Sequence, residues 1–397
     1  MKAAAAILLA LVVLAGTVAA VPDEKSDVPP YGFDRMEIVK VGWGCMSLRT
    51  AKIDGDDLDD IVFINNPKAR IDIYLSRPDG VEPEEDVSDK EPNDLPEDRF
   101  FKKEELLTEK EVTAIRVTDV DGDGHTDIAY YGKPPELVIA YGDGKAGFSR
   151  TKSFAVENAM ETGSALAVGD LDGNGKADLA FLTKKETLLY HQKEKGEFGE
   201  PLRIPHGAKT IYAVSIEDLN GDGKSDLVSI AGNDARPIRV RFQLAGGALG
   251  PEYALKMAPY RSLGFEDLRE GGGTEVVAIQ RKSGLLRLLE VAKATKEGAR
   301  IDLGTVQVHP FPESGGSKTR KMAIGDVNGD GRNDILVTEP GTAQVALHLQ
   351  TEAGEVGPRL LFPSLSEADD LVAADFDGDG KGGDPGRLLL GGERDDL

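Results

Sequence analysis

Residues 119–127 read DVDGDGHTD, and this stretch decides how the rest of the chain is interpreted. Its pattern, D-x-[DN]-G-[DN]-G-x-x-D, recurs in full at residues 170–178 (DLDGNGKAD), 218–226 (DLNGDGKSD) and 326–334 (DVNGDGRND). Three degenerate copies accompany these, at residues 52–60 (KIDGDDLDD), 267–275 (DLREGGGTE) and 375–384 (DFDGDGKGGD). Self-similarity of this kind indicates one supersecondary unit that is used several times.

The spacing and the strand pattern of the repeats predict their fold. The closing acids of successive copies lie 48 to 67 residues apart, about the length of a four-stranded propeller blade. An alternating run enters the loop, as in residues 165–169 (ALAVG), and an apolar run leaves it, as in residues 179–182 (LAFL). A third run such as residues 137–141 (LVIAY) precedes a Gly-containing turn and a fourth strand. The prediction is an all-β fold, a β-propeller of about seven four-stranded blades.

Residues 1–30 have the features of an export signal followed by a linker, and not those of a propeller blade. Residues 1–20 carry a single charge, Lys2, before an apolar run that ends in small residues, which predicts a cleaved signal peptide. An uncleaved membrane anchor is the alternative, because the run is close to the minimum length of a span. We expect residues 21–30 to be a polar linker and residues 31–397 to form the propeller. No later stretch is apolar and long enough to span a bilayer.

Two parts of the chain depart from the regular repeat. Residues 79–99 (DGVEPEEDVSDKEPNDLPEDR) are acidic and proline-rich, so we expect a disordered loop inserted in the first blade. Residues 31–41 resemble the outer strand of a preceding blade and are expected to complete the last unit. Beyond residues 387–392 (RLLLGG) no third strand is evident. The seventh blade is therefore expected to be incomplete or degenerate.

Composition limits the classes of partner. The net charge of −23 argues against nucleic acid and favours divalent cations as counter-ions. Cys45 is the only cysteine of the 397 residues, so no internal disulfide stabilises an exported chain. Another interaction must hold the short hairpins together.

The loop chemistry is that of a hard cation. Side-chain oxygens at positions 1, 3, 5 and 9, with a backbone carbonyl near position 7, can converge on Ca²⁺. Glycines at positions 4 and 6 permit the positive φ angles that wrap the chain around an ion. An EF-hand is excluded, because it needs Glu at position 12 and flanking helices, whereas position 12 here falls in β-type runs. The 52–60 copy offers Asp54, Asp56 and Asp60 for weak binding, and the 267–275 copy is not expected to bind.

These loops and the Gly-x-Phe turns resemble FG-GAP/VCBS repeats, the bacterial relatives of the integrin α-subunit propeller. The resemblance covers roughly residues 31–397 and implies seven blades with Ca²⁺ in the loop between the first two strands. The copies at 52–60, 267–275 and 375–384 depart from the pattern. The ligands that it implies are Asp119, Asp121, Asp123, Asp127, Asp170, Asp172, Asn174, Asp178, Asp218, Asn220, Asp222, Asp226, Asp326, Asn328, Asp330, Asp334, Asp375, Asp377, Asp379 and Asp384.

The turns between second and third strands, except the sixth at residues 339–342 (EPGT), carry basic residues and lie on the face opposite the acidic loops. We call this set the basic ring, and it comprises Lys68, Arg70, Lys133, Lys184, Lys185, Arg236, Arg281 and Lys282. Connections on the same face add Lys209, Arg261, Lys318 and Arg320. The ring is a candidate surface for an anionic glycan or an acidic protein. The alternative is that these are ordinary solvated turn residues.

The remaining question is whether the chain is an enzyme. The five histidines (His125, His191, His206, His309 and His348) are scattered over different repeats, and no Gly-x-Ser-x-Gly or His-Glu-x-x-His pattern occurs. We therefore expect a non-catalytic binding or adhesion module that is secreted, periplasmic or on the cell surface. One alternative is a polysaccharide lyase or hydrolase built on a propeller. Another is a calcium-stabilised structural module of an envelope assembly.

Overall fold

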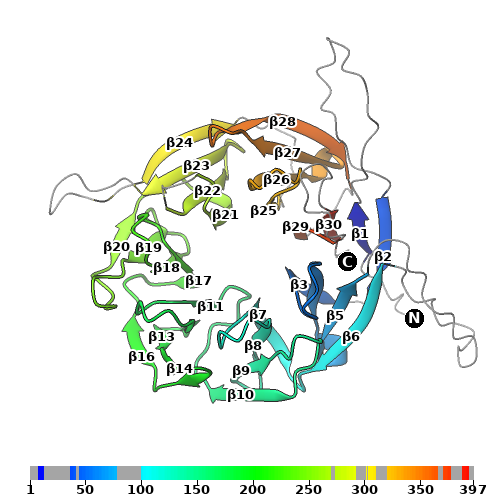
Figure 1. Ribbon diagram of the computed structural model, residues 1–397. Helices are drawn as coiled ribbons and strands as arrows, with labels where there is room; N and C mark the ends of the chain where they lie inside the picture. Colours follow the sequence, from blue (N-terminus) through cyan, green and yellow to red (C-terminus); the bar gives the residue numbers. More distant parts are fainter. Residues whose placement is uncertain are drawn as a thin grey trace, which may run out of the picture.

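The computed structural model describes residues 8–12, 36–41, 44–77, 100–269, 273–291, 301, 303–309, 320–364, 370–376 and 387–392. Over these residues the protein is a β-propeller, a ring of four-stranded antiparallel sheets (Figure 1). The predicted all-β class is confirmed, because apart from strands the described elements are two short 3-10 turns, η1 (Asn66–Lys68) and η2 (Pro340–Thr342). No helix in this part of the chain is long and apolar enough to cross a membrane.

Strands that follow one another in the sequence build each blade, from the central opening outward. In blade order they are β3 (Cys45–Ala51), β4 (Asp60–Asn65), β5 (Arg70–Ser76) and β6 (Phe101–Leu107); β7 (Glu111–Thr118), β8 (Asp127–Lys133), β9 (Glu136–Tyr141) and β10 (Arg150–Ala155); β11 (Leu166–Gly169), β12 (Asp178–Leu182), β13 (Glu186–Tyr190) and β16 (Leu202–Pro205); β17 (Ile211–Glu217), β18 (Asp226–Ala231), β19 (Ile238–Arg241) and β20 (Tyr253–Leu255); β21 (Tyr260–Glu266), β22 (Glu275–Gln280), β23 (Leu286–Val291) and β24 (Leu303–His309); β25 (Met322–Gly325), β26 (Asp334–Glu339), β27 (Gln344–Gln350) and β28 (Val356–Pro363). The third blade also contains a short hairpin of β14 (Gln192–Glu194) and β15 (Glu197–Phe198).

The described residues thus give six blades of consecutive strands, a small difference from the predicted count of about seven within a propeller fold that is confirmed. A further sheet, in the order β2-β1-β30-β29, joins the two ends of the chain. It combines β1 (Leu8–Val12) and β2 (Met36–Lys40) with β29 (Asp370–Ala374) and β30 (Arg387–Gly392). The last repeat has two strands of its own in the described residues, so the N-terminal part of the chain supplies the others.

Two predictions from the sequence concern this terminal sheet. The expected outer strand from residues 31–41 is present as β2. Strand β1 lies inside the predicted signal peptide, residues 1–20, so cleavage there would remove it from the sheet. The predicted linker at residues 21–30 and the predicted disordered loop at residues 79–99 lie outside the described residues.

Burial explains the difference between the middle and the outer strands. Every residue of β4 and β12 is buried, because each of these strands lies between two others and is covered on both faces by neighbouring blades. Strand β10 forms the rim of its blade and alternates between exposed and half-buried residues. The continuous apolar runs of the sequence are therefore the middle strands, and the mixed runs are the edges.

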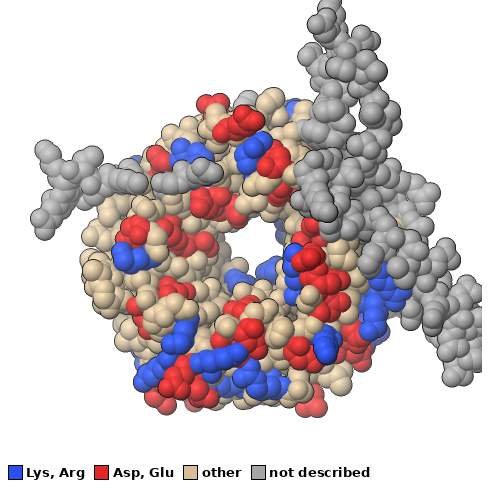
Figure 2. Space-filling model, in the orientation of Figure 1, with Lys and Arg blue, Asp and Glu red and all other residues tan. Residues whose placement is uncertain are grey.

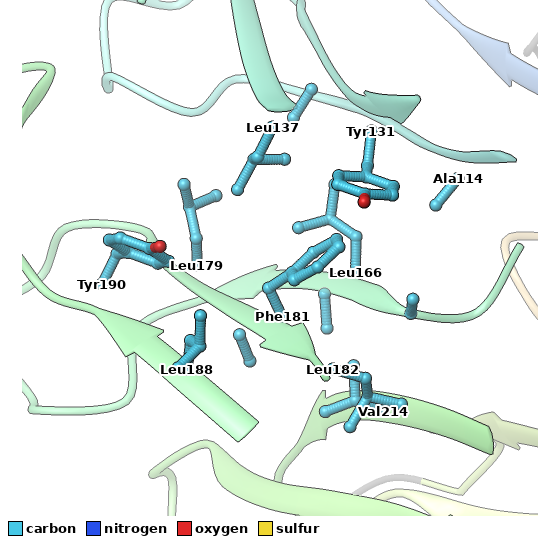
Figure 3. Close-up of a cluster of buried hydrophobic side chains, with 14 of the residues drawn as sticks. Ala114, Tyr131, Leu137, Leu166, Leu179, Phe181, Leu182, Leu188, Tyr190 and Val214 are labelled. Carbon is cyan, nitrogen blue, oxygen red and sulfur yellow. The ribbon is translucent and has the colours of Figure 1, made fainter. Parts of the chain in front are cut away.

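Large side chains fill the spaces between blades. Tyr131 on β8 and Phe181 on β12 come from adjacent blades, and their ring centres lie 4.8 Å apart (Figure 3). Phe181 is fully buried, within a cluster that also contains Leu166 and Leu179. The core thus lies between sheets, and each blade depends on its neighbours.

A substitution at this contact tests the packing. We expect Phe181→Ala to lower the free energy of unfolding by about 3–5 kcal/mol, because it removes a ring and leaves a cavity between two blades. The control is Leu202→Ala, at a side chain that is 52% exposed, for which we expect a change within about 0.5 kcal/mol. Chemical denaturation of both variants measures the difference, and equal losses would contradict the packing.

Candidate metal centre

The acidic loops join the first and second strands of the blades, as predicted. Residues 119–127 connect β7 to β8, and residues 170–178 connect β11 to β12. Gly122 and Gly124 have φ angles of +76° and +87°, which side chains of L-residues rarely adopt. Positions 4 and 6 of the pattern are therefore glycine because of the backbone conformation.

The first acid of each complete loop organises the backbone of the loop itself. One carboxylate oxygen of Asp119 accepts a hydrogen bond from the N–H of Gly122 at 2.7 Å, and the other accepts from Gly124 at 2.8 Å. Equivalent bonds are made by the first acids of the other complete copies, Asp170, Asp218 and Asp326. This acid holds the loop in shape and keeps its remaining lone pairs at the centre of the turn.

The closing acid attaches the loop to the blade. The carboxylate of Asp226 accepts from the N–H of Leu219 at 3.1 Å and from the N–H of Gln243, beyond the third strand, at 2.9 Å. The same double contact is made by the other closing aspartates, which are also 0% exposed: Asp60, Asp127, Asp178 and Asp334. One buried carboxylate therefore connects three parts of each blade.

Burial makes the closing carboxylates of three loops costly to ionise. It raises the pKa of Asp60 and of Asp226 to about 7, and that of Asp334 to about 6. Nearby loop acids raise these pKa values further, and the backbone N–H groups partly oppose the shift. A divalent cation beside such a group would favour its ionised form.

The second blade gathers three carboxylates into one group. Oxygens of Asp119, Asp121 and Asp127 all lie within 4.8 Å of one another. Oδ1 of Asp121 is buried and accepts no hydrogen bond, while Lys195 Nζ lies 3.8 Å away and Arg150 pairs with the other oxygen. An oxygen-only set with a buried, unsatisfied oxygen fits a hard cation such as Ca²⁺. Asp123 lies outside this group.

The third blade gathers a different set. Asp172 and Asp178 are joined by His191, whose Nδ1 lies 3.6 Å from a carboxylate oxygen of Asp172 and 3.0 Å from one of Asp178. The hydrogen bond with Asp178 raises the pKa of His191. From the sequence this histidine was grouped with the scattered ones. Its position directly after β13, where the chain passes the loop of its own blade, is the signal that would have placed it at the loop.

The loops of the fourth and sixth blades have asparagine at position 3. Asn220 and Asn328 accept the N–H of Asp222 and Asp330. The acids at position 5 are in turn contacted by basic side chains of their own loops, Lys224 and Arg332. These loops keep the same backbone form as the 119–127 loop, but they have one carboxylate fewer.

Comparison with known protein families identifies the repeats. Residues 119–181, 170–229 and 326–382 match the FG-GAP-like repeat. The chain carries FG-GAP-like repeats. This confirms the predicted resemblance, and an FG-GAP propeller is typically a non-catalytic binding fold.

One solved structure agrees on the architecture. A crystal structure of BBS1N in complex with ARL6DN, soaked with mercury, is 11% identical, with a TM-score of 0.51 over 88% of this chain and 91% of that one. A second crystal of the complex, soaked with lead, gives a TM-score of 0.47 at 11% identity over 88% and 92% of the two chains. At this identity the likeness concerns the fold alone. No curated protein sequence matches the chain.

The degenerate loops replace the acids in different ways. In the 267–275 loop, Arg269 lies 2.8 Å from Glu275 and 2.5 Å from Glu290, so the loop supplies its own positive charge. In the 52–60 loop, Asp60 keeps the closing contacts, and the N–H of Asp59 donates to the carbonyl of Asp375 at 2.7 Å. The predicted ligands Asp377, Asp379 and Asp384 lie outside the described residues.

Glutamines that the sequence analysis did not single out link consecutive FG-GAP loops. The side-chain amide of Gln192 donates to the carbonyl of Val120 at 2.8 Å, and that of Gln243 donates to the carbonyl of Asp170 at 3.1 Å. Gln350 makes the same contact with Leu268. Each glutamine thus contacts its own closing acid through its backbone N–H and the preceding loop through its side chain. Their common position at or just after the end of the third strand is the signal in the sequence.

The basic ring lies at the opposite ends of the strands. Lys68, Lys133, Lys184, Lys185, Arg236, Arg281 and Lys282 are exposed. Two members are engaged in ion pairs: Arg70 lies 2.6 Å from Asp72, and Lys133 lies 2.7 Å from Glu161. Of the added connections, Arg320 is buried and Lys318 lies outside the described residues. Figure 2 shows one face of the propeller, on which both acidic and basic residues surround an open centre.

The closing contact can be tested without any metal. We expect Asp226→Asn to lower the free energy of unfolding in EDTA by about 1–3 kcal/mol, because the new amide turns an N–H toward a buried N–H donor. Asp222→Asn is the matched control, since an asparagine oxygen can still accept the N–H of Lys224. Denaturation in EDTA compares the two variants, and equal stabilities would show that the buried contact contributes nothing.

Proposed function

We propose that this protein is a secreted, calcium-binding FG-GAP propeller that acts as a non-catalytic binding or adhesion module. The observation that carries the calcium assignment is the 119–127 loop, where three carboxylates converge around the buried, unsatisfied oxygen of Asp121. Hard cations with oxygen ligands and flexible coordination suit such a set. The predicted signal peptide at residues 1–20 supports export to the periplasm, the cell surface or the medium.

The proposed role of calcium is structural. Asp119, Asp121 and Asp127 would hold the ion in the second blade, and the ion would supply the positive charge that their ionised forms need. Asp127 already connects the loop to the end of the third strand through the N–H of Gly142. A bound ion would therefore stabilise the junction of three strands and leave the opposite face free for a partner.

Calcium should stabilise the fold, more at higher pH. The raised pKa values of Asp60, Asp226 and Asp334 mean that the folded, metal-free protein binds protons more tightly than the unfolded chain. Its stability therefore falls as the pH rises from about 4 to about 7. Burial also raises the pKa of Asp127 in the proposed calcium loop, and calcium binds the ionised form. The increase in Tm on adding 10 mM Ca²⁺ should therefore be larger at pH 8 than at pH 5.5.

Thermal unfolding with Ca²⁺ and with EDTA measures this effect at both pH values. Asp121→Asn should reduce the calcium-dependent shift, while Asp143→Asn, in a turn of the same blade that lies outside the loop, should leave it unchanged. A wild-type Tm that does not respond to EDTA would refute the calcium assignment.

We propose further that the basic ring binds an anionic glycan or an acidic protein. What supports this is the exposure of its lysines and arginines on the face away from the acidic loops. Lys184, Lys185, Arg281 and Lys282 form no ion pair in the part of the chain that the structure describes. Their charges are therefore available to a partner, and such contacts weaken with salt.

Charge reversal tests the basic ring. Arg281→Glu with Lys282→Glu should shorten retention on heparin or alginate resin at low salt, because it converts two exposed cations of the ring to anions. The matched control is Lys145→Glu with Lys193→Glu, two exposed lysines on the side of the FG-GAP loops. Equal retention of the wild type and both double variants would contradict a role for the ring.

A further inference from the structure

A trough of about 630 Å³ lies on the side wall of the ring, between the second and third blades. Its walls come from β10 of one blade and from β13, β16 and the segment after β15 of the next. Phe154, Leu188, Tyr190 and Phe198 line it. Its volume is that of a site for a small ligand or a short peptide segment.

Strand alternation and the extra hairpin of the third blade create the trough. Lys152 and Phe154 are the half-buried positions of β10, and Leu188 and Tyr190 alternate along β13. Phe198, on β15, adds a third aromatic ring. The ring centre of Phe154 lies 4.9 Å from that of Tyr190 and 5.8 Å from that of Phe198, so one end of the trough is aromatic. Figure 3 shows Tyr190 and Leu188 as members of the buried cluster between these blades.

Hydrogen bonds across the blade boundary fix both ends of the trough. At the aromatic end, the carbonyl of Gly196 accepts from Lys152 Nζ at 3.0 Å and from the Tyr141 hydroxyl at 3.3 Å. At the other end, the N–H of Lys184 donates to the carbonyl of Asn158 at 2.9 Å. The walls are therefore held in place before a ligand arrives, which lowers the entropy cost of binding.

The two ends differ in chemistry. Lys184 and Lys185 are exposed at the end away from the aromatic rings, and neither has a carboxylate partner among the described residues. Glu186, beside them, is already paired with Arg203 at 2.5 Å. The rim also carries Glu157 and Glu200. From Glu186, the residue next to Lys185, to Tyr190 strand β13 advances four residues, about 13 Å, which is the approximate distance between the basic end and the apolar end.

We propose that this trough binds an extended peptide segment of a protein partner, with an aromatic or large aliphatic side chain against Phe154 and Phe198, the two half-buried rings that line its aromatic end. An acidic residue about four positions away along the peptide would meet Lys184 and Lys185. An extended ligand advances at the same rate as β13, so the two anchors match the two ends. The inference rests on the proposed function, because both lysines belong to the basic ring, and it specifies the partner as a protein.

Labelled peptides of defined sequence test the proposal. The probes are fluorescein-labelled seven-residue peptides with one Phe and one Asp separated by two, three or four Gly/Ser residues, and a Gly/Ser peptide without either anchor. Fluorescence anisotropy with the full-length protein measures Kd. We expect the three-residue spacer to bind tightest and the anchorless peptide not to bind.

Two variants and their matched controls locate the site. Phe198→Ala should weaken binding about tenfold, which corresponds to about 1.4 kcal/mol. Its control, Tyr253→Ala, removes a partly buried aromatic side chain on the outer strand of another blade and should have no effect. Lys184→Glu with Lys185→Glu should also weaken binding, whereas Arg281→Glu with Lys282→Glu should leave it unchanged. Thermal unfolding of each variant confirms that it is folded.

The outcomes separate this proposal from that of the basic ring. If the Arg281 and Lys282 variant loses retention on heparin but keeps peptide affinity, both proposals stand. If heparin retention does not depend on the ring while the trough variants lose peptide binding, the trough stands alone. The absence of binding by any anchored peptide would overturn the trough assignment. Competition by a neutral oligosaccharide at the same residues, without peptide binding, would also overturn it.

Discussion

The fold depends on a buried carboxylate at the end of each complete loop. In the fourth blade, Asp226 contacts the start of the loop through Leu219 and the end of the third strand through Gln243. An ionised group without solvent is unfavourable unless other groups compensate it, and two backbone N–H donors do so only in part. The same arrangement recurs from blade to blade, so the stability of the whole ring responds to whatever balances these charges. The acidic loop therefore both reverses the direction of the chain and places a buried negative charge that must be compensated for the fold to be stable.

The blades are also connected to one another through these loops. Gln192 and Gln243 each contact their own closing acid and a carbonyl of the loop before. A change in one loop therefore reaches the next blade through two hydrogen bonds, in addition to the packing of rings such as Tyr131 on Phe181. This connection explains how a trough between two blades can keep its shape, because its walls belong to neighbours that are joined at their loops.

Much of the architecture was predictable because the repeat itself fixes it. The repeat period predicts the length and number of the blades, and the alternation of apolar and polar side chains predicts which strands lie at the edge. The nine-residue pattern predicts the closing acids such as Asp127. The features that sequence reasoning missed depend on how distant segments pass one another. His191 joins Asp172 and Asp178 because the third strand ends beside the loop, and Arg269 takes the place of a cation because Glu290 lies opposite. The strand pattern of the last repeat predicted an incomplete blade but not the pairing of β30 with β1.

The ring closes where the first loop meets the last. The N–H of Asp59 donates to the carbonyl of Asp375, and the N–H of Asp375 donates back to the carboxylate of Asp59 at 2.8 Å, across 316 residues of chain. Few contacts in a protein carry so large an entropy of loop closure, and contacts of this range form late in folding. Blades can therefore form and pack one after another during synthesis, whereas the contact between Asp59 and Asp375 forms only after the last repeat has been made. A pair of optical labels placed across this contact would record the moment at which a linear stack becomes a ring.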